Sequence, residues 1–502
     1  MKCDNIIILG GGSAGWMTAA TLIKTYPHKN ITVIESPNTP IIGVGESTIY
    51  HIKHFINYLE IDEEDFLAKT DGSYKLSIKF TDFYKKGEAF HYPFGSPNIE
   101  GTLNNLNDWW YKKFLNPKTP YTDYAESYYE AMQLVNNNKF EEGTPYAYHF
   151  DATKFGAYLK EHYCKPRGVK HIADDITKIN SDENGISDLN GKYKADLYID
   201  CTGFKSLLLD KTLEEPFESY EDMLPNNSAW ATRISYTEKE RQLEPYTNCT
   251  ALGNGWVWNI PLWSRIGTGY VYSDKYISDE DALQEFKEHL GRDDLEFKKI
   301  KMRVGIHKRL FVKNVVAIGL SAGFIEPLES NGLFSVHEFL KELIRNLNRD
   351  IVTQWDKDNF TSSCKAIFRG FAEFVALHYA LSNRNDTKYW QDNNNKTWSN
   401  DLIELKKSSI NGFVDAVNRR NFNYNHFDGQ GGLHAIAAGM HWSPTEMNNI
   451  LWLNDNDTKE DFEKKWTPFI ESLDNRKKEW KEKYKNSETL YKYLKKKIYT
   501  KE

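Results

Sequence analysis

The sequence predicts an α/β fold, with a doubly wound module at the N-terminus, a region of β-sheet inserted into it and a mainly helical C-terminal part. Three patterns predict this fold. An apolar run at 5–9 leads through a glycine loop into a helix-forming stretch, and a second apolar run follows at 31–34. Several strand-like runs lie within 228–275, and helix formers prevail after residue 365. Strands that alternate with helices are typical of a parallel sheet.

The length of the chain favours a large module with appended elements, because 502 residues are many for one compact core. We expect residues 1–365 to form the doubly wound module, with insertions over approximately 75–150 and 205–310. Residues 366–502 are expected to form a helical region that packs on this module.

Four segments carry local expectations. Residues 73–83 alternate apolar and polar side chains, which predicts one half-buried strand with Lys75 on its open face. The segment 95–150 is rich in Asn, Pro, Tyr and Trp and is interpreted as an irregular insertion, and 383–400 as a polar interruption. The Lys-rich tail from 470 predicts a solvated helix whose Trp and Tyr side chains face the body of the protein.

Charge and composition argue against several classes of protein. The net charge of −7 argues against nucleic-acid binding, because phosphate binding favours a basic surface. The five cysteines are scattered without a CxxC, which predicts free buried thiols in a reducing compartment and no metal site. No apolar run approaches the roughly 20 residues that a membrane helix needs. We therefore expect a soluble cytoplasmic protein that binds neither nucleic acid nor membrane, with monomer and homo-oligomer both open.

The glycine loop after the first strand is the first motif with a specific chemistry. Gly10, Gly12 and Gly15 form a GxGxxG motif, and Glu35 ends the following strand. The first glycine of such a loop permits the tight turn, the second lets the backbone approach a pyrophosphate, and the third lets helix and strand pack closely. The pyrophosphate then lies at the positive end of the helix, and Glu35 can accept hydrogen bonds from ribose hydroxyls. The motif predicts a dinucleotide site.

The acid at the strand end suits both NAD and FAD. Two later strands end in glycine, at 200–203 and 317–319, and resemble the later nucleotide-contacting strands of FAD-binding proteins of the glutathione-reductase type. A chain that binds NAD alone needs neither of them, and the sequence has no second GxGxxG for a nicotinamide domain. FAD is therefore the predicted cofactor, and the module is expected to be of that type.

Six blocks of sequence carry a family resemblance. The most specific is the WxWxIP motif at 256–261. The others are GGGSAGW at 10–16, GVGEST at 43–48, YKLSIKF at 74–80, GFIEPLESNG at 323–332 and HYALSNRNDTKYW at 378–390. In these blocks the chain resembles flavin-dependent halogenases, and it looks most like the free-standing tryptophan halogenases rather than the carrier-protein-dependent branch. The blocks keep their order across most of the chain.

The resemblance implies an enzyme that needs reduced FAD (FADH2), dioxygen and a halide ion, and a separate flavin reductase that supplies the FADH2. In that family, halide is oxidised at the flavin to hypohalous acid, which travels to a separate substrate pocket. A lysine there activates the acid, either by hydrogen bonding or as a haloamine. The implied substrate is a small electron-rich aromatic, indole-like, tryptophan-like or phenolic, and the implied halide is chloride, bromide or iodide.

Three residues match the catalytic group of the family. Lys75 matches the catalytic lysine, Glu329 matches the active-site glutamate, and Ser330 would hydrogen-bond this pair. An ammonium can polarise the hypohalous oxygen, and a carboxylate could orient the acid or take the proton lost from the ring. From spacing alone, Lys75 is also consistent with a surface lysine and Glu329 with a cap of the following helix. Lys79 lies where the family does not require a lysine.

Halide and flavin contacts follow from the same resemblance. Asn331 and Gly332 match the halide-binding positions, where backbone N–H groups at a helix start suit an anion. Asn331 stands where the family usually has Thr. The positions expected to contact the cofactor are Gly10, Gly12, Ser13, Ala14, Gly15, Glu35, Ser36, Ile42, Val44, Ser47, Ile176, Leu320 and Leu333.

The expected substrate side is aromatic. Trp256 and Trp258 lie two apart on a strand and so point to the same side, and with Pro261 they match the family's wall between flavin and substrate. Two core tryptophans are the alternative interpretation. Phe94 aligns with a His-Pro-Phe element that sandwiches indole, and Tyr92 replaces the His of that element.

Two other functions stay open at the level of sequence. One is an FAD-dependent aromatic monooxygenase, which would form product without halide. The other is a non-catalytic flavoprotein or dinucleotide-binding module, which would need neither Lys75 nor Glu329. The substrate itself is also open, because residues 432–442 do not clearly reproduce the family's contacts to the carboxylate and amine of tryptophan.

Overall fold

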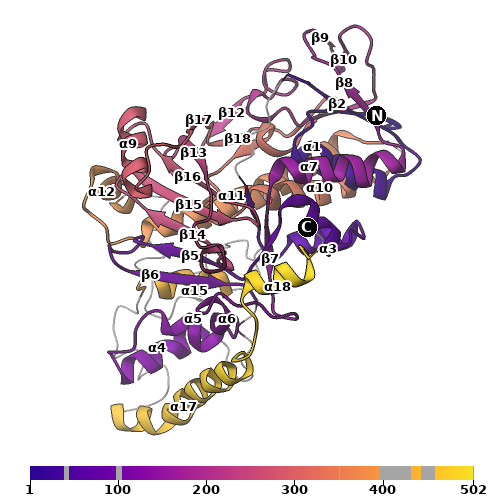
Figure 1. Ribbon diagram of the computed structural model, residues 1–502. Helices are drawn as coiled ribbons and strands as arrows, with labels where there is room; N and C mark the ends of the chain where they lie inside the picture. Colours follow the sequence, from indigo (N-terminus) through magenta and orange to yellow (C-terminus); the bar gives the residue numbers. More distant parts are fainter. Residues whose placement is uncertain are drawn as a thin grey trace.

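The computed structural model describes residues 1–38, 45–95, 97, 105–349, 351–395, 431–442 and 458–500. It shows a mixed α/β protein, as the sequence predicts (Figure 1). All five cysteines are buried free thiols, which confirms that expectation. No helix in these ranges is long and apolar enough to cross a membrane. Among the same residues, no three His, Cys, Asp or Glu side chains gather as metal ligands would.

The glycine loop lies at one end of a six-stranded sheet with the order β19-β20-β11-β1-β2-β8. Neighbouring strands pair in parallel, except that β19 pairs antiparallel with β20. The strands are β1 (Asn5–Leu9), β2 (Asn30–Glu35), β8 (Lys170–Ala173), β11 (Leu197–Asp200), β19 (Phe311–Val312) and β20 (Val315–Ala317). Helix α1 (Ser13–Thr25) joins β1 to β2, which confirms the predicted βαβ unit. Strands are added on both sides of β1. Sheets of this kind bind ligands in a crevice at the carboxyl ends of such strands, so we expect a ligand crevice at the ends of β1 and β11.

A seven-stranded sheet forms the second large layer and has the order β17-β13-β16-β15-β14-β5-β6. Its strands are β5 (Ser77–Thr81), β6 (Ala89–Pro93), β13 (Ser228–Ile234), β14 (Tyr246–Ala251), β15 (Gly255–Pro261), β16 (Ile266–Tyr272) and β17 (Lys298–Lys301). The predicted strands within 228–275 are therefore confirmed. The parallel pairing of β5 with β14 joins the early hairpin to this later run of strands.

The expectation of one half-buried strand over 73–83 is wrong, because two strands of different sheets occupy this segment. The chain changes sheets at Leu76, which lies between β4 (Ser73–Lys75) and β5. Strand β4 belongs to a small sheet with the order β3-β7-β4, in which the partners are β3 (Glu46–Ser47) and β7 (Ala147–Phe150). Lys75 and Ser77 are fully buried, because protein packs on both faces where the alternation indicated one open face. The surface-lysine interpretation of Lys75 is therefore wrong.

Helices fill two segments that the composition left irregular. The segment 95–150 contains α4 (Asn105–Leu115), α5 (Asp123–Tyr128) and α6 (Met132–Val135), and 383–400 contains α12 (Lys388–Asn395). Burial of Trp109 and Trp110 on α4 explains the first difference, because tertiary packing of an aromatic face overrides a weak local propensity. The Lys-rich tail is helical as predicted, but its helix α17 (Lys459–Lys483) begins before residue 470.

The remaining helices are α2 (Ile52–Tyr58), α3 (Glu63–Thr70), α7 (Ala152–Tyr158), α8 (Lys239–Gln242), α9 (Asp279–Leu290), α10 (Gly332–Leu347), α11 (Gln354–Ala380), α15 (Gly431–Gly439) and α18 (Leu490–Lys497). Short two- or three-stranded sheets join β9 (Ile179–Asp182) to β10 (Gly185–Leu189), and β18 (Gly305–His307) to β12 (Phe217–Ser219) and β21 (Gly323–Phe324). Helix α11 packs on α10, and α17 lies beside α4 and α5 at the bottom of the view in Figure 1. Both large sheets contribute to one continuous hydrophobic core.

Candidate functional site

The glycine loop has the shape that close approach of a ligand requires. Gly10 has a φ of +119°, and a Cβ on it would lie 2.2 Å from the carbonyl oxygen of Cys201. A Cβ on Gly15 would lie 1.9 Å from the Gly10 carbonyl oxygen. A Cβ on Gly12 would meet nothing within 4 Å, and Gly12 is the N-cap of α1 without a side-chain cap. The loop is therefore closed toward the sheet and open at Gly12, where a pyrophosphate could reach the N–H groups of the first helical turn.

Glu35 ends β2 beside this loop, as predicted. A Cβ on Gly11 would lie 1.6 Å from Glu35 Oε2, so the carboxylate lies against the glycine turn. Two basic side chains lie beside its other oxygen, Oε1: Lys160 Nζ at 2.6 Å and His171 Nε2 at 2.7 Å. The sequence did not indicate Lys160 and His171 as neighbours of Glu35, because they lie on the helical segment after α7 and on β8, which are distant in the chain.

The other residues expected to contact the cofactor have varied surroundings, and two of them lie outside the described ranges. Ser13 donates from Oγ to the Ala152 carbonyl at 3.1 Å, and Ser36 Oγ accepts from the backbone N–H of Asn38. Ala14 lies opposite Gly319, whose Cβ would be 2.8 Å from that of Ala14. Leu320 is partly exposed, Leu333 is buried and Ile176 is half-buried. Ile42 and Val44 lie outside the described residues.

Lys75 occupies the end of β4 in a fully buried position. Its Nζ donates to the Thr48 carbonyl oxygen at 2.8 Å and to Ser330 Oγ at 2.9 Å. Burial lowers the pKa of Lys75 from 10.5 to about 7, and the nearby Cys249 and Glu329 act in the opposite direction. Protein oxygens thus accept two of the three hydrogen bonds that the Lys75 ammonium can donate. Because its pKa is about 7, both the charged and the neutral form of Lys75 are accessible near neutral pH.

A run of buried hydroxyls continues from Lys75 into the β-sheets. Ser330 Oγ lies 2.9 Å from Ser47 Oγ, and Ser47 Oγ lies 2.5 Å from Thr247 Oγ1. Thr247 Oγ1 in turn lies 2.8 Å from His149 Nε2. Burial lowers the pKa of His149 well below its ordinary value, which favours the neutral ring. Sequence reasoning missed Thr247 and His149, since nothing local marks residues from β14 and β7 that meet only in the fold.

Glu329 is buried to 1% exposure, and the imidazole ring of His378 lies beside its carboxylate. His378 Nε2 lies 2.8 Å from Glu329 Oε1. The alternative interpretation of Glu329 as a helix cap is wrong, because Asn331 is the N-cap of α10 and no side chain caps that helix. Glu329 lies instead in the turn before α10, facing α11.

The expected halide positions lie at the start of α10. Asn331 is 1% exposed, and its Oδ1 has no hydrogen-bond partner among the described residues. A Cβ on Gly332 would have Glu46 Oε2, at 4.0 Å, as its nearest neighbour. Burial raises the pKa of Glu46 to about 7, with Asp151 adding to the shift. A carboxylate that takes up a proton easily therefore lies beside the predicted anion position.

Trp256 and Trp258 lie on β15 with ring centroids 6.2 Å apart, and both are buried. Trp256 Nε1 donates to Glu326 Oε2 at 2.6 Å, whereas Trp258 Nε1 has no hydrogen-bond partner among the described residues. Pro261 ends the strand, and its carbonyl oxygen accepts from Ser73 Oγ at 2.6 Å. The motif that carried the family resemblance is thus bonded directly to β4.

Phe94 brings an aromatic ring to the lysine. The Phe94 ring centroid lies 5.0 Å from Lys75 Nζ, and Phe94 is buried. Tyr92 is half-buried, and its ring centroid lies 6.2 Å from that of Phe94. Helix α15 approaches closely, since a Cβ on Gly432 would lie 2.4 Å from Tyr92 Oη. The predicted aromatic pair and the predicted lysine are therefore neighbours.

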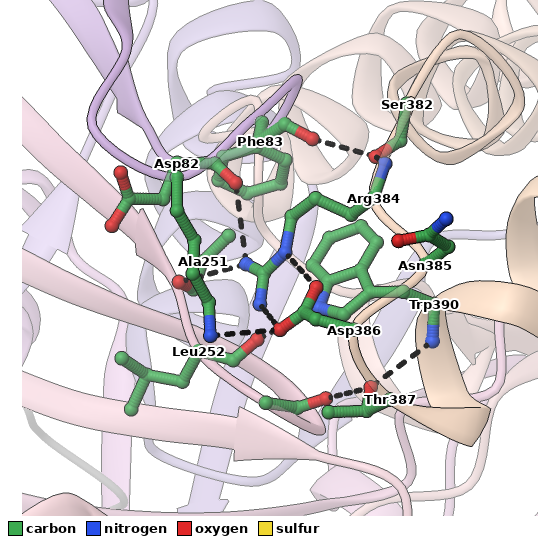
Figure 2. Close-up of polar contacts among 12 residues, drawn as sticks. Asp82, Phe83, Ala251, Leu252, Ser382, Arg384, Asn385, Asp386, Thr387 and Trp390 are labelled. Carbon is green, nitrogen blue, oxygen red and sulfur yellow. Dashed lines mark hydrogen bonds and ion pairs between the residues drawn. The ribbon is translucent and has the colours of Figure 1, made fainter.

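The turn after α11 is tied to the ends of two strands of the seven-stranded sheet (Figure 2). Arg384 donates to the carbonyl oxygens of Asp82 and Ala251 at 3.2 and 3.1 Å, and forms two 2.9 Å bonds to Asp386. Ser382 Oγ donates to the Phe83 carbonyl at 2.6 Å. Thr387 Oγ1 donates to the carbonyl of Gly253 at 2.6 Å. These contacts hold the C-terminal end of α11 against β5 and β14.

Comparisons with protein families, known sequences and solved structures identify relatives of this chain. Residues 5–452 match the family model described as tryptophan halogenase. The chain is 35% identical over 435 residues to the tryptophan 6-halogenase SttH of Streptomyces toxytricini, covering 80% of this chain and 83% of that protein. It is 34% identical over 421 residues to the tryptophan 7-halogenase RebH of Lentzea aerocolonigenes, covering 78% of this chain and 79% of that protein. The solved structure of apo VirX1 is 37% identical, with a TM-score of 0.87 over 99% of this chain and 100% of that one.

Proposed function

The chain belongs to the tryptophan halogenase family and is a flavin-dependent halogenase, and we propose that it transfers halogen from hypohalous acid to a small electron-rich aromatic substrate through Lys75. The observation that carries the proposal is the fully buried Lys75 Nζ, which lies 2.9 Å from Ser330 Oγ and 5.0 Å from the Phe94 ring centroid. A buried ammonium beside an aromatic ring has no evident structural purpose, because desolvation of such a charge is unfavourable. The names of the relatives support an indole- or tryptophan-like substrate, with phenols as the other aromatic class.

The crevice at the carboxyl ends of β1 and β11 fits FAD. Gly12 leaves open space over the start of α1, and Glu35 lies against the same turn. Gly10, Gly12 and Gly15 would hold the pyrophosphate, and Glu35 the ribose, in a module of the glutathione-reductase type. Reduced FAD bound there supplies, with dioxygen, the oxidising power that converts halide to hypohalous acid. A separate flavin reductase would deliver the FADH2.

The chemistry at Lys75 can be written from the protein side. The Lys75 ammonium donates a hydrogen bond to the oxygen of hypohalous acid, which makes the halogen more electrophilic. The π-electrons of the substrate form the carbon–halogen bond as the halogen–oxygen bond breaks, and the oxygen leaves as water with a proton from Lys75. Glu329 takes the ring proton, so that rearomatisation completes the exchange of hydrogen for halogen. Return of that proton to Lys75 restores the site.

Halide and substrate would be kept apart by named parts of the chain. Asn331 and Gly332 would hold the halide with backbone N–H groups at the start of α10. Trp256 and Trp258 would form the wall between flavin and substrate, and their burial on β15 is consistent with this role. Tyr92 and Phe94 would line the aromatic pocket. Confinement matters, since hypohalous acid that escapes to water reacts indiscriminately.

One assay separates this function from aromatic monooxygenation. The purified protein is incubated with FAD, NADH, a generic flavin reductase, an indole or a phenol, and chloride or bromide, and the product masses are measured. We expect halogenated product that is strictly dependent on added halide. An oxygenated aromatic that forms equally well without halide would assign the chain to the monooxygenases instead.

A further inference from the structure

The Glu329 carboxylate is buried without a hydrogen-bond donor. Neither of its oxygens accepts a hydrogen bond from the described residues, and its side chain is almost completely enclosed. Burial of an ionised carboxylate is strongly unfavourable unless a positive charge lies close to it. His378 supplies the nearest candidate, with Nε2 2.8 Å from Glu329 Oε1, a contact at ion-pair distance that is not aligned as a hydrogen bond.

The other nitrogen of the ring limits the protonation states of His378. Nδ1 lies 3.1 Å from the Phe374 carbonyl oxygen, one turn earlier on α11. A carbonyl oxygen can only accept, so Nδ1 carries a proton. If Nε2 had none, its lone pair would face the carboxylate oxygen of Glu329 at 2.8 Å, and the two would repel each other. A proton between Nε2 and Oε1 converts this repulsion into attraction, and when the imidazole carries it the pair is an imidazolium next to a carboxylate.

A second buried glutamate, Glu326, lies in the same turn, and burial raises its pKa above the ordinary value. Glu326 accepts hydrogen bonds from Trp256 Nε1, Asn226 Nδ2 and Tyr379 Oη, all of them neutral donors. Its carboxyl also interacts electrostatically with His378. The turn before α10 therefore presents two buried carboxyls to one imidazole. The other nitrogen base of the site, Lys75, has a pKa that burial lowers to about 7, and its Nζ is engaged by Ser330 and Thr48.

The ring of His378 is also held in place. It is fully buried, with the Phe80 ring centroid at 4.9 Å and that of Phe374 at 5.6 Å. One turn further along the chain, Arg384 and Ser382 fasten the end of α11 to the strands that carry the site (Figure 2). The block 378–390, which helped to carry the family resemblance, thus begins with the imidazole that faces Glu329. It also contains Ser382 and Arg384, which hold the end of α11 in place.

We propose that His378 is a positioning residue for halogen transfer: as an imidazolium, it holds the Glu329 carboxylate in its charged form by contact with Oε1 and leaves Oε2 to receive the proton from the substrate ring. This role rests on the proposed function, because it assigns to Glu329 the uptake of that proton. A general base has to be ionised, and a positive charge in contact with the carboxylate offsets the unfavourable burial of its negative charge.

Two substitutions of His378 separate its contacts. In His378→Asn the amide can replace Nδ1 at the Phe374 carbonyl, but nothing reaches Glu329. In His378→Gln the longer amide can donate to Glu329 without carrying a charge. We expect His378→Asn to lower kcat for halogenation about 100-fold with little change in KM for the aromatic, and His378→Gln to recover part of the loss. Formation of hypohalous acid, followed with an oxidisable dye, should be unchanged in both variants.

A double variant tests whether His378 acts through Glu329. Glu329→Gln alone should lower kcat about as much as His378→Asn, and the two changes together should be at most about threefold worse than either one. The matched control is His28→Asn at an exposed histidine, which should behave like the parent protein. Losses that multiply in the double variant, or a His378→Asn variant as active as the control, would overturn the proposal.

A measurement without turnover keeps this inference distinct from the proposed function. Histidine side chains labelled with ¹⁵N should show one imidazolium signal that disappears in His378→Asn. In Glu329→Gln the same residue should change to the neutral form protonated at Nδ1. A neutral His378 in the parent protein would sink the inference even if halogenation is found. A parent protein that shows the imidazolium but halogenates nothing would instead contradict the proposed function.

Discussion

The ammonium group of Lys75 is enclosed by the protein on all sides, and this enclosure affects both stability and chemistry. The pKa of Lys75 is about 7 in the folded protein against an ordinary value of 10.5. Between these two pH values the unfolded chain binds more protons than the folded one, so the contribution of Lys75 to the free energy of unfolding rises with pH. Below pH 7 the unfavourable contribution is present in full. A side chain with this effect is expected where function requires it.

Replacement of the lysine should therefore separate stability from activity. We expect Lys75→Met to lower halogenation by about 1,000-fold while leaving FAD binding and hypohalous acid formation intact. The same variant should increase the free energy of unfolding by about 2–4 kcal/mol at pH 6, and by less as the pH rises toward 10. Denaturant titration and product mass spectrometry provide the two measurements.

The matched control for Lys75→Met is Lys79→Met, at a lysine four residues further along the chain. Lys79 is half-buried, with its Nζ 5.7 Å from the centroid of the Tyr246 ring. Lys79→Met should be close to silent in halogenation. A Lys75→Met variant that halogenates at the parent rate would remove Lys75 from the mechanism.

The pH dependence of halogen transfer distinguishes the two ways in which a lysine can act. If the ammonium form donates a hydrogen bond, the transfer rate should fall as pH rises through about 7, because the proton is lost there. A haloamine route needs the free amine, so its rate would rise over the same range. We expect the fall, measured as the single-turnover rate of aromatic halogenation between pH 6 and 9. A rise would assign the amine route.

At the scale of single elements, the two tryptophans of β15 are held in place by different kinds of contact. Trp256 gives its indole N–H to Glu326 Oε2, and Glu326 also bonds Asn226 and Tyr379. Trp258 packs its ring against Gly269, where a Cβ would lie 2.2 Å from Trp258 Cη2. One ring is therefore fixed by a polar network and the other by close packing on β16.

This difference predicts unequal effects of the same substitution. Trp256→Phe should decrease the free energy of unfolding by about 1–3 kcal/mol, because a buried carboxyl loses a donor. Trp258→Phe removes an N–H that has no hydrogen-bond partner in the described part of the chain, and it should cost less. Both variants should halogenate with lower yield if the rings form the wall, which product analysis at equal flavin turnover would reveal. Unchanged yields in both would favour the core-tryptophan interpretation.

The residues that follow α18 attach the tail to the body of the protein. The Tyr499 ring stacks on Trp263 with centroids 4.1 Å apart and an angle of 3° between the planes. Its hydroxyl donates to the carbonyl oxygens of Leu67 and Gly72. The tail was expected to turn its aromatic side chains inward, and Tyr499 and the buried Tyr484 do so.

Removal of the Tyr499 side chain should destabilise the whole fold. Tyr499→Ala is expected to decrease the free energy of unfolding by about 3–4 kcal/mol, through loss of both the stacked ring and the hydroxyl. Tyr499→Phe keeps the ring and should cost about 1 kcal/mol. Thermal unfolding of the two variants checks the order. Equal melting temperatures for Tyr499→Ala and the parent would mean that α18 is not coupled to the fold.

At the scale of the whole molecule, the site draws each of its parts from a different element. Lys75 ends β4, His149 lies on β7, Thr247 on β14, Glu329 before α10 and His378 on α11. Small shifts between these elements would change the geometry at the lysine, so the site depends on the packing of both large sheets. The proposed substrate pocket and halide position would share this dependence.

Halide and substrate range should reflect the two positions at which this chain departs from its relatives. Asn331 stands at the expected halide position and Tyr92 in the expected aromatic pocket. Larger halides lose less hydration energy on burial than chloride and are easier to oxidise. We expect bromide to be used at least as well as chloride, and several indoles and phenols to be accepted. Competition assays with equal chloride and bromide over such a panel decide this, and strict chlorination of tryptophan at one carbon would contradict it.

Local patterns in the sequence were enough for the first βαβ unit with its glycine loop and for the strands within 228–275. GxGxxG between strand and helix, with Glu35 at the next strand end, predicts geometry that depends on residues within one βαβ unit. The motif blocks were enough for the family and for Lys75 and Glu329 as candidates. Each of these inferences uses residues that lie close together in the chain, or a resemblance that needs no coordinates.

Only the tertiary structure decided the burial and the partners of the candidate side chains. Alternation over 73–83 indicated an open face for Lys75, yet a change of sheet at Leu76 places Lys75 in the interior. His378 and Glu329 are far apart in the sequence, and so are Thr247 and His149, and no local signal connects either pair. Burial and charge pairing depend on the sum of contacts from distant segments, whereas periodicity and motifs report only on neighbours along the chain.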